Sequence, residues 1–182
     1  MDKRKQIIDS ATKLFSEQGF ENTSISAICK MANVSNGLVF HHFKNKNELL
    51  REIFSSTTGI VVKMIEEYEE QSEGMDPKVR LRQHIERIFH QMEEDKEFFQ
   101  LYLSVMFYPT TRLILIDLIE ERSDILLGFA ERLLKGVHHE KSSILKYMFT
   151  SELDGIAINY IYKTDEYPLE TVKEQMIQRY TS

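Results

Sequence analysis

The chain has 182 residues, of which 42% are hydrophobic, with no Trp, seven Gly, three Pro and a single Cys. One cysteine, Cys29, excludes an intramolecular disulfide framework. No apolar run approaches the ~20 residues of a membrane-spanning helix, and the charged N-terminus lacks the apolar core of a signal peptide. We therefore expect a cytoplasmic protein with no membrane partner.

The net charge of −6 is unevenly distributed along the chain. Residues 1–50 hold seven Lys or Arg against five Asp or Glu, a balance of +2, so the remaining 132 residues carry −8. A locally basic face on an acidic body is compatible with a nucleic-acid partner for the N-terminal part.

Apolar residues recur at helical spacing along most of the chain, which predicts an all-α fold. Helix stops are expected at Gly19 and Asn33, and a capping box at Asn45 with Glu48 three residues later. No β-type alternation, repeat or low-complexity tract stands out. About nine helices are predicted, over residues 3–18, 24–32, 36–42, 45–70, from 77 onward, 95–107, 110–135, 142–162 and 169–180.

The segment between residues 23 and 46 is the most informative part of the sequence. Two short helices are predicted there, joined by a tight turn at Asn33, an amide residue that tolerates the left-handed conformation. Ser35 is expected to cap the second helix, which is short and rich in polar side chains. This arrangement is typical of a helix-turn-helix, which places its second helix in the major groove. The pattern predicts DNA binding.

A set of residues in this part of the chain has the order of a known family: Ala11, Leu14, Phe15, Gly19, Phe20, Thr23, Ile25, Ile28, Ala32, Val34, Ser35, Gly37, His42, Phe43, Lys46 and Leu49. In these positions the chain resembles the N-terminal domain of the TetR (tetracycline repressor) family, over about residues 3–53. The resemblance implies a DNA-binding domain of residues 1–48, and a helical domain of residues 49–182 that dimerises and binds a small-molecule effector. The chain departs from the family where the usual turn Gly is Asn33 and the usual Tyr of the recognition helix is Phe40.

The resemblance also implies which residues face DNA. Among them, Asn36 suits an adenine edge and Leu38 a thymine methyl group, whereas Phe40 lacks the hydroxyl with which a Tyr would reach a phosphate. The alternative is a three-helix unit that binds a protein and no DNA. The predicted DNA-contacting residues are Thr23, Ser24, Ser35, Asn36, Gly37, Leu38, Phe40, His41, His42 and Lys46.

Aromatic residues and methionines are frequent between residues 89 and 149. At helical spacing each is more often ordinary core, but the resemblance implies that some line a cavity between helices. We expect a small effector that is mostly apolar or aromatic. The candidate ligand-binding residues are Phe89, Met92, Phe99, Tyr102, Met106, Phe129 and Phe149.

The segment from residue 143 to 162 is apolar on more than one face, so it needs two packing partners. Together with the resemblance, this predicts a two-fold interface of four helices, two from each chain. The alternative is that both faces are buried within one chain. The candidate dimer residues are Met148, Gly155, Ile158, Val172 and Met176.

Other chemistries have weaker support. No Ser-His-Asp order, paired-Cys motif or Gly-rich phosphate loop is present, so we expect no enzyme and no cofactor. His84 and His90 are six residues apart, which does not place two imidazoles on one metal ion, and Cys29 is more simply a core residue than a redox sensor. Together with the sequence, the resemblance implies a transcriptional repressor that binds a palindromic operator as a homodimer, with recognition helices about 34–36 Å apart. A bound effector is expected to release it from the operator.

Overall fold

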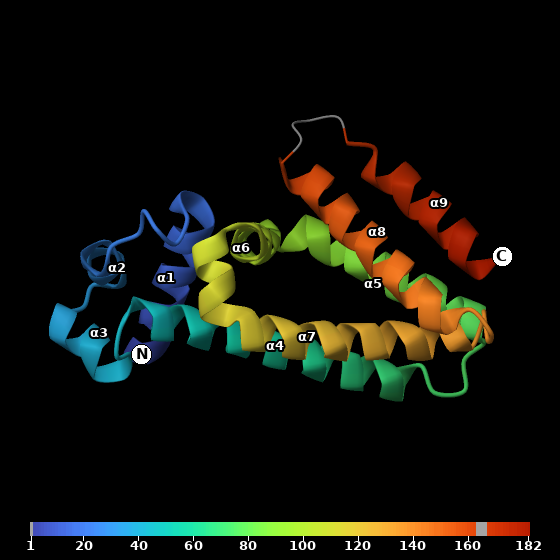
Figure 1. Ribbon diagram of the computed structural model, residues 1–182, viewed down its shortest axis with the longest axis horizontal. Coiled ribbons are helices and arrows are strands. Elements are labelled where there is room, and N and C mark those ends of the chain that lie inside the picture. Colours follow the sequence, from blue (N-terminus) through green and yellow to red (C-terminus); the bar gives the residue numbers. More distant parts are fainter. Residues whose placement is uncertain (1, 163–166) are drawn as a thin grey trace. The chain divides into compact units, whose positions relative to one another are not determined.

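The computed structural model describes residues 2–162 and 167–182, and these ranges fold into helices with no strand (Figure 1). The all-α prediction is confirmed, and the helix boundaries agree with the predicted ones to within one or two residues. The helices are α1 (Lys3–Gln18), α2 (Ile25–Ala32), α3 (Asn36–His42), α4 (Lys46–Gln71), α5 (Pro77–Glu94), α6 (Lys96–Phe107), α7 (Pro109–Lys135), α8 (Ser142–Tyr162) and α9 (Leu169–Thr181).

Side-chain caps explain why several helices start where the sequence predicts. The Asn45 Oδ1 accepts a hydrogen bond from the Glu48 backbone N–H at 2.8 Å, just before α4 begins. The Asp76 carboxylate accepts from the N–H groups of Lys78 and Val79 at 2.9 and 3.2 Å. Each cap satisfies backbone donors that the first helical turn leaves without a partner.

The chain divides into two compact units. Unit 1 comprises Met1–Ile60 and Glu97–Glu120, and unit 2 comprises Val61–Lys96 and Glu121–Ser182. Long helices α4 and α7 each contribute to both units. The boundary predicted at residue 48 divides the chain by function and stays a prediction.

Unit 1 is built around the three short N-terminal helices (Figure 1). Phe15 is fully buried, and its ring lies 5.3 Å from that of Phe20, centroid to centroid. Leu101 of α6 and Leu115 of α7 belong to the same apolar cluster. Burial of this cluster fixes α1, α2 and α3 as one body.

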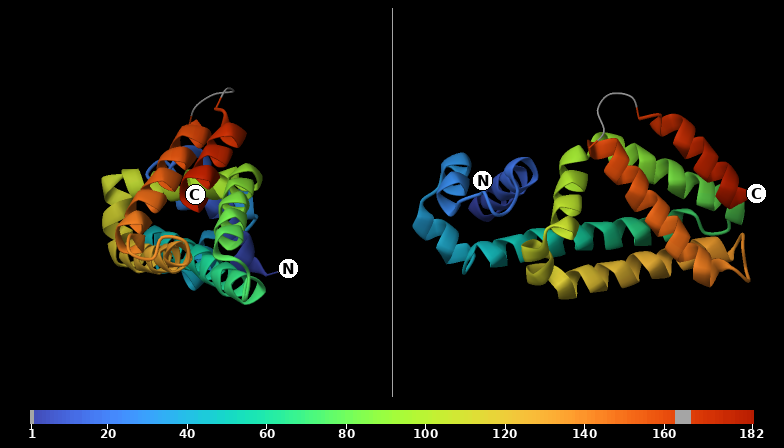
Figure 2. Two further views of the ribbon diagram at one scale, coloured as in Figure 1. Left: turned by 90° about the vertical axis from the view of Figure 1, so that its right-hand side faces the viewer. Right: turned by 45° about the horizontal axis from the view of Figure 1, so that its top comes forward.

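In unit 2, α5 and α9 pack along each other (Figure 2). Phe89 of α5 and Met176 of α9 are buried, with exposed fractions of 2% and 1%. The Tyr180 hydroxyl donates to the Glu152 carboxylate at 3.1 Å and so ties α9 to α8. Within the described residues no single helix is long and apolar enough to cross a membrane, and only the bent pair of α6 and α7, counted together, passes such a test.

Candidate nucleic-acid interface

A left-handed residue makes the turn between α2 and α3. Asn33 has φ 49° and ψ 55°, a conformation that Asn tolerates better than other side-chain-bearing residues. The next N–H, that of Val34, donates to the Cys29 carbonyl at 3.0 Å. The predicted turn is confirmed, and Asn33 takes the left-handed position in it.

Both helices of the motif begin with a capping serine. The Ser24 Oγ accepts from the Ala27 N–H at 3.1 Å, and the Ser35 Oγ accepts from the Leu38 N–H at 3.2 Å. Both serines are exposed. A hydroxyl that accepts in this way keeps its own hydrogen to donate, so each cap can also bind a phosphate oxygen.

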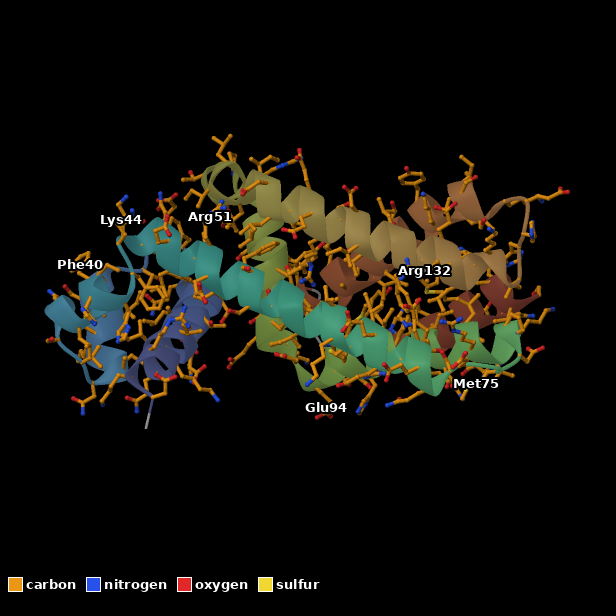
Figure 3. All side chains as sticks on the ribbon, turned by 90° about the horizontal axis from the view of Figure 1, so that it is seen from below. Phe40, Lys44, Arg51, Met75, Glu94 and Arg132 are labelled. Atoms are coloured by element: carbon orange, nitrogen blue, oxygen red, sulfur yellow. The ribbon has the colours of Figure 1, made fainter. Side chains whose placement is uncertain are left out.

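One side chain anchors α3, while most of the others point away from the core. Val39 is 1% exposed and Leu38 is half-buried. Phe40 is 53% exposed, a large fraction for a phenyl ring, and Figure 3 shows it at the same end of the molecule as Lys44. The other exposed residues of α3 are Asn36, Gly37, His41 and His42.

The segment that contains α2 and α3 carries no acidic residue. Between Glu21 and Glu48 the sequence contains no Asp or Glu. Lys30 and Lys44 are both exposed within this stretch. Absence of carboxylates removes the main repulsion that a DNA backbone would meet.

Lys44 is a candidate that the sequence analysis did not select. It follows α3 directly, in the turn before α4, and its side chain is exposed. A cation placed immediately after a recognition helix was the available signal, because such flanking positions contact the phosphate backbone.

Gly37 is not required by the fold. A Cβ atom built there would lie 3.9 Å from the Ser35 Oγ, which is an ordinary contact, and the residue has no positive φ. Any reason for a glycine at this position therefore lies outside the chain, on the exposed side of α3.

Thr23 has a structural position that does not suit the predicted phosphate contact. Its side chain is 1% exposed. The hydroxyl donates toward two carbonyls, those of Leu14 at 3.2 Å and Gly19 at 2.9 Å. Thr23 thereby holds the loop that links α1 to α2, and Ser24 is the exposed hydroxyl of the pair.

Lys46 also bonds within the chain. Its ammonium donates to the carbonyls of Phe20 at 2.8 Å and Thr23 at 3.0 Å. It lies 4.2 Å from the centroid of the Phe20 ring, a cation–π contact. The first residue of α4 is thus tied to the loop before α2, so the ammonium supports the motif whether or not it also reaches a phosphate.

Replacing Lys46 by methionine separates these two roles. Because methionine keeps an apolar stem and loses the ammonium, we expect the free energy of unfolding to fall by roughly 1–2 kcal/mol, the effect of losing charge-assisted hydrogen bonds at a partly exposed site. Urea denaturation measures this loss. If Lys46 only holds the loop before α2 and contacts no phosphate, the dependence of DNA affinity on salt concentration should be the same in Lys46→Met and in the wild type.

The matched control is Lys44→Met. Lys44 is exposed, so the change should leave stability within about 0.5 kcal/mol and, if Lys44 contacts a phosphate, reduce the salt slope by about 1. A reduced slope for Lys46→Met with unchanged stability would instead assign the phosphate contact to Lys46.

The seven candidate effector residues fall in different places. Four of them, Phe89, Met92, Phe129 and Phe149, are at most 2% exposed within unit 2. The other three, Phe99, Tyr102 and Met106, are half-buried in unit 1.

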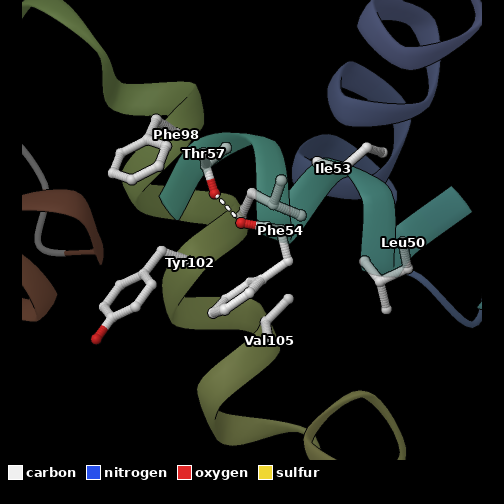
Figure 4. Close-up of a pocket in the computed structure, with 8 residues that line it drawn as sticks. Leu50, Ile53, Phe54, Thr57, Phe98, Tyr102 and Val105 are labelled. Carbon is white, nitrogen blue, oxygen red and sulfur yellow. Dashed lines mark hydrogen bonds between the residues drawn. The ribbon is translucent and has the colours of Figure 1, made fainter. Parts of the chain in front are cut away.

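Tyr102 lines a small apolar pocket between α4 and α6 within unit 1 (Figure 4). The pocket volume is about 10 Å³, close to the space that one water molecule requires. Thr57, which also lines it, donates its hydroxyl to the Phe54 carbonyl at 2.7 Å. An effector of drug-like size would enter this pocket only after side chains move apart. The lining residues are Leu50, Ile53, Phe54, Thr57, Phe98, Leu101, Tyr102 and Val105.

The five candidate dimer residues also differ in exposure. Met176 is 1% exposed within a single chain, so it is a core residue of unit 2 rather than a contact residue. Met148 is 58% exposed, and no atom lies within 4 Å of a Cβ built on Gly155. Ile158 and Val172 are half-buried.

The remaining sequence candidates gain no support. Cys29 is 7% exposed, and burial raises the pKa of its thiol, which disfavours the reactive thiolate. Among residues 2–162 and 167–182, no group of His, Cys, Asp and Glu side chains is arranged to hold a metal ion.

Comparison with known proteins finds a family match in the N-terminal part of the chain. Residues 7–53 match the family described as "Bacterial regulatory proteins, tetR family". The uncharacterized HTH-type transcriptional regulator YhgD of Bacillus subtilis is 25% identical over 91% of this chain and 75% of its own length. The HTH-type transcriptional regulator AcrR of Shigella flexneri is 34% identical, but over only 58% of this chain and 48% of its own length.

A solved structure extends the likeness of fold along the whole chain. The transcriptional regulator FadR from Bacillus subtilis, solved in complex with stearoyl-CoA, superposes with a TM-score of 0.78. It is 22% identical, and the match covers 98% of this chain and 97% of that one. These relatives are transcriptional regulators and not enzymes. The N-terminal motif, residues 7–53, is thus that of the TetR family, and the curated relatives that share it are transcriptional regulators.

Proposed function

We propose that this protein is a cytoplasmic repressor that binds a palindromic operator as a homodimer and that a small apolar effector releases. The observation that carries the proposal is the exposed face of α3. It starts with a serine cap, has no acidic residue and is flanked by Lys30 and Lys44.

The proposed contacts follow from this exposure. Ser24 and Ser35 donate to phosphate oxygens while capping their helices. Asn36 forms two hydrogen bonds to an adenine edge, the pairing that its amide geometry suits. His41 and His42, whose rings form an edge contact at 5.2 Å, lie farther along α3 and contact base or backbone.

Dimerisation through α8 is supported by a stripe of exposed or half-exposed residues along that helix. Successive members are separated by four, three, four, three and four positions, the spacing at which two helices pack along a shared seam. Ile144 and Tyr162, at its two ends, are 64% and 60% exposed. The α8 stripe consists of Ile144, Met148, Ser151, Gly155, Ile158 and Tyr162.

Two observations support an apolar effector: the apolar residues on α6 and the ligand of one relative. Phe99, Tyr102 and Met106 give unit 1 a half-buried apolar surface on α6. The Bacillus subtilis FadR was solved with stearoyl-CoA, a ligand that is largely a hydrocarbon chain. We propose an effector of that general character for this protein, bound as the side chains around Tyr102 separate.

A polar connection within unit 1 gives the effector a route to the DNA-binding helices. The Arg51 guanidinium on α4 holds both oxygens of Asp117 on α7, at 2.7 and 2.6 Å, and also donates to the Ile114 carbonyl at 2.7 Å. A shift of α7 is therefore transmitted to the start of α4, which follows α3 directly. An effector lowers DNA affinity by as much as it prefers the shifted conformation.

The decisive experiment measures DNA binding by fluorescence anisotropy for the wild-type protein and for the variant Gly37→Ala. DNA from upstream of the protein's own gene is compared with scrambled DNA. We expect selective binding at two chains per site. Because the fold tolerates a Cβ atom at residue 37, the variant should be as stable as the wild type or up to about 1 kcal/mol more stable. The same atom blocks close approach of the backbone to DNA, so affinity should fall roughly tenfold.

Gly59→Ala is the matched control. Gly59 is an exposed glycine within α4, with no atom within 4 Å of an added Cβ. This variant should gain similar stability with unchanged DNA affinity. Equal affinity of Gly37→Ala and wild-type protein would remove α3 from the interface. Absence of any DNA binding at low salt would favour the alternative, a helical protein-interaction module.

A further inference from the structure

Phe40 is the exposed apolar side chain of α3, whose other exposed residues are Asn36, Gly37, His41 and His42. The ring is 53% exposed. Gly37 precedes it by three positions, which on a helix places the two residues next to each other. Because Gly37 has no side chain, it does not cover the ring.

An exposed phenyl ring limits what Phe40 can contact on DNA. It has no hydroxyl, so it cannot donate to a phosphate. Among the groups that B-form DNA displays in the major groove, the thymine C5-methyl group is the apolar one. The deoxyribose of the backbone is also partly apolar, but contact with it carries no sequence information.

We propose that Phe40 is a specificity-determining residue that packs on a thymine methyl group, once in each half of the operator. This inference rests on the proposed DNA-binding function and deepens it by naming the base that the ring recognises. Gly37 has a second role in this arrangement, since the space it leaves admits the methyl group beside the ring. The operator then requires a T·A pair at that position because of the thymine methyl group, independently of any hydrogen bond to the base pair.

The alternative source of an exposed aromatic ring is a protein-binding surface. The surroundings of Phe40 argue against a protein partner. Lys30, Lys44, His41 and His42 lie on or beside the same motif, and the segment between Glu21 and Glu48 has no carboxylate. A polyanion is the partner that such a surface suits.

The test uses an operator selected from random DNA with the full-length protein, after which each thymine is replaced in turn by deoxyuridine. Uracil keeps every hydrogen-bonding group and lacks only the methyl group. We expect one position in each half-site to weaken binding about fourfold, the effect of one buried methyl group. Replacing a thymine that α3 does not contact should leave the binding affinity unchanged.

Variants assign the effect to the ring. Phe40→Ala should bind thymine and uracil operators equally, whereas Phe40→Tyr, which keeps the ring, should retain the fourfold difference. Phe107→Ala removes a ring that is 63% exposed at the end of α6 and should behave as the wild type.

Outcomes for this inference differ from those for the proposed function. If no operator can be selected, the proposed function itself fails. If an operator is bound but uracil substitution changes nothing, or if Phe40→Ala stays sensitive to uracil, the Phe40 assignment is wrong while DNA binding stands. The uracil series on the wild-type protein decides the matter even if Phe40→Ala does not fold.

Discussion

Replacing Met148 by glutamate is expected to convert the protein from two chains to one. Met148 is the second of the six residues of the proposed α8 stripe and is 58% exposed in the single chain. In a two-fold interface the residue is present once from each chain, so one substitution buries two carboxylates in an apolar seam. Buried and unpaired charges of this kind are strongly destabilising. Light scattering should show a mass near 21.5 kDa instead of twice that value.

The same substitution should weaken operator binding roughly 100-fold. Each chain then binds its half-site independently, without the high effective concentration that the dimer gives the second DNA-binding domain. Met75→Glu is the matched control. Met75 is 40% exposed in the connection between α4 and α5, so the identical change there should leave both mass and affinity unaltered. A wild-type protein that is a monomer, or a Met148→Glu variant that stays dimeric, would place the interface elsewhere.

Local signals explain why so much of the fold could be predicted from the sequence. Stops at Gly19 and Asn33 and caps at Ser35 and Asn45 depend on residues within one helical turn of the boundary. Each of these signals is present in the sequence, and the structure has helix ends at those positions.

Roles that depend on distant parts of the chain were less predictable. Thr23 and Lys46 fit phosphate-contacting positions by their order along the sequence. The carbonyls that they bond are brought near by the packing of α1 and α4, and spacing does not reveal this. Likewise, Met176 has the helical spacing of an interface residue, but α5 already covers that face of α9.

The loss of stability at mildly acidic pH should be governed in part by a histidine in unit 2. His84 of α5 is partly buried, and its ring lies 4.9 Å from that of Phe129, 5.4 Å from that of Tyr68 and 6.5 Å from that of Phe149. Burial, followed by the positive charges of Arg87 and Arg80, lowers the pKa of His84 to about 3. The ring therefore stays neutral in the folded protein throughout the physiological range.

The unfolded chain behaves differently, since an exposed histidine takes up a proton near pH 6.5. Between about pH 6.5 and pH 3 the unfolded state binds a proton that the folded state excludes, so this group lowers stability as the pH falls. From pH 7 to pH 5 the loss should reach about 2 kcal/mol. Urea denaturation at a series of pH values measures it.

His84→Phe isolates this contribution, because phenylalanine keeps an aromatic ring in the cluster and has no group to protonate. The variant should lose about 2 kcal/mol less than the wild type between pH 7 and pH 5. His90→Phe is the matched control on the same helix, where the side chain is exposed, and its pH dependence should follow the wild type. Parallel curves for His84→Phe and wild-type protein would mean that the folded state accepts the proton, which requires the aromatic cluster around His84 to open to water below pH 6.5.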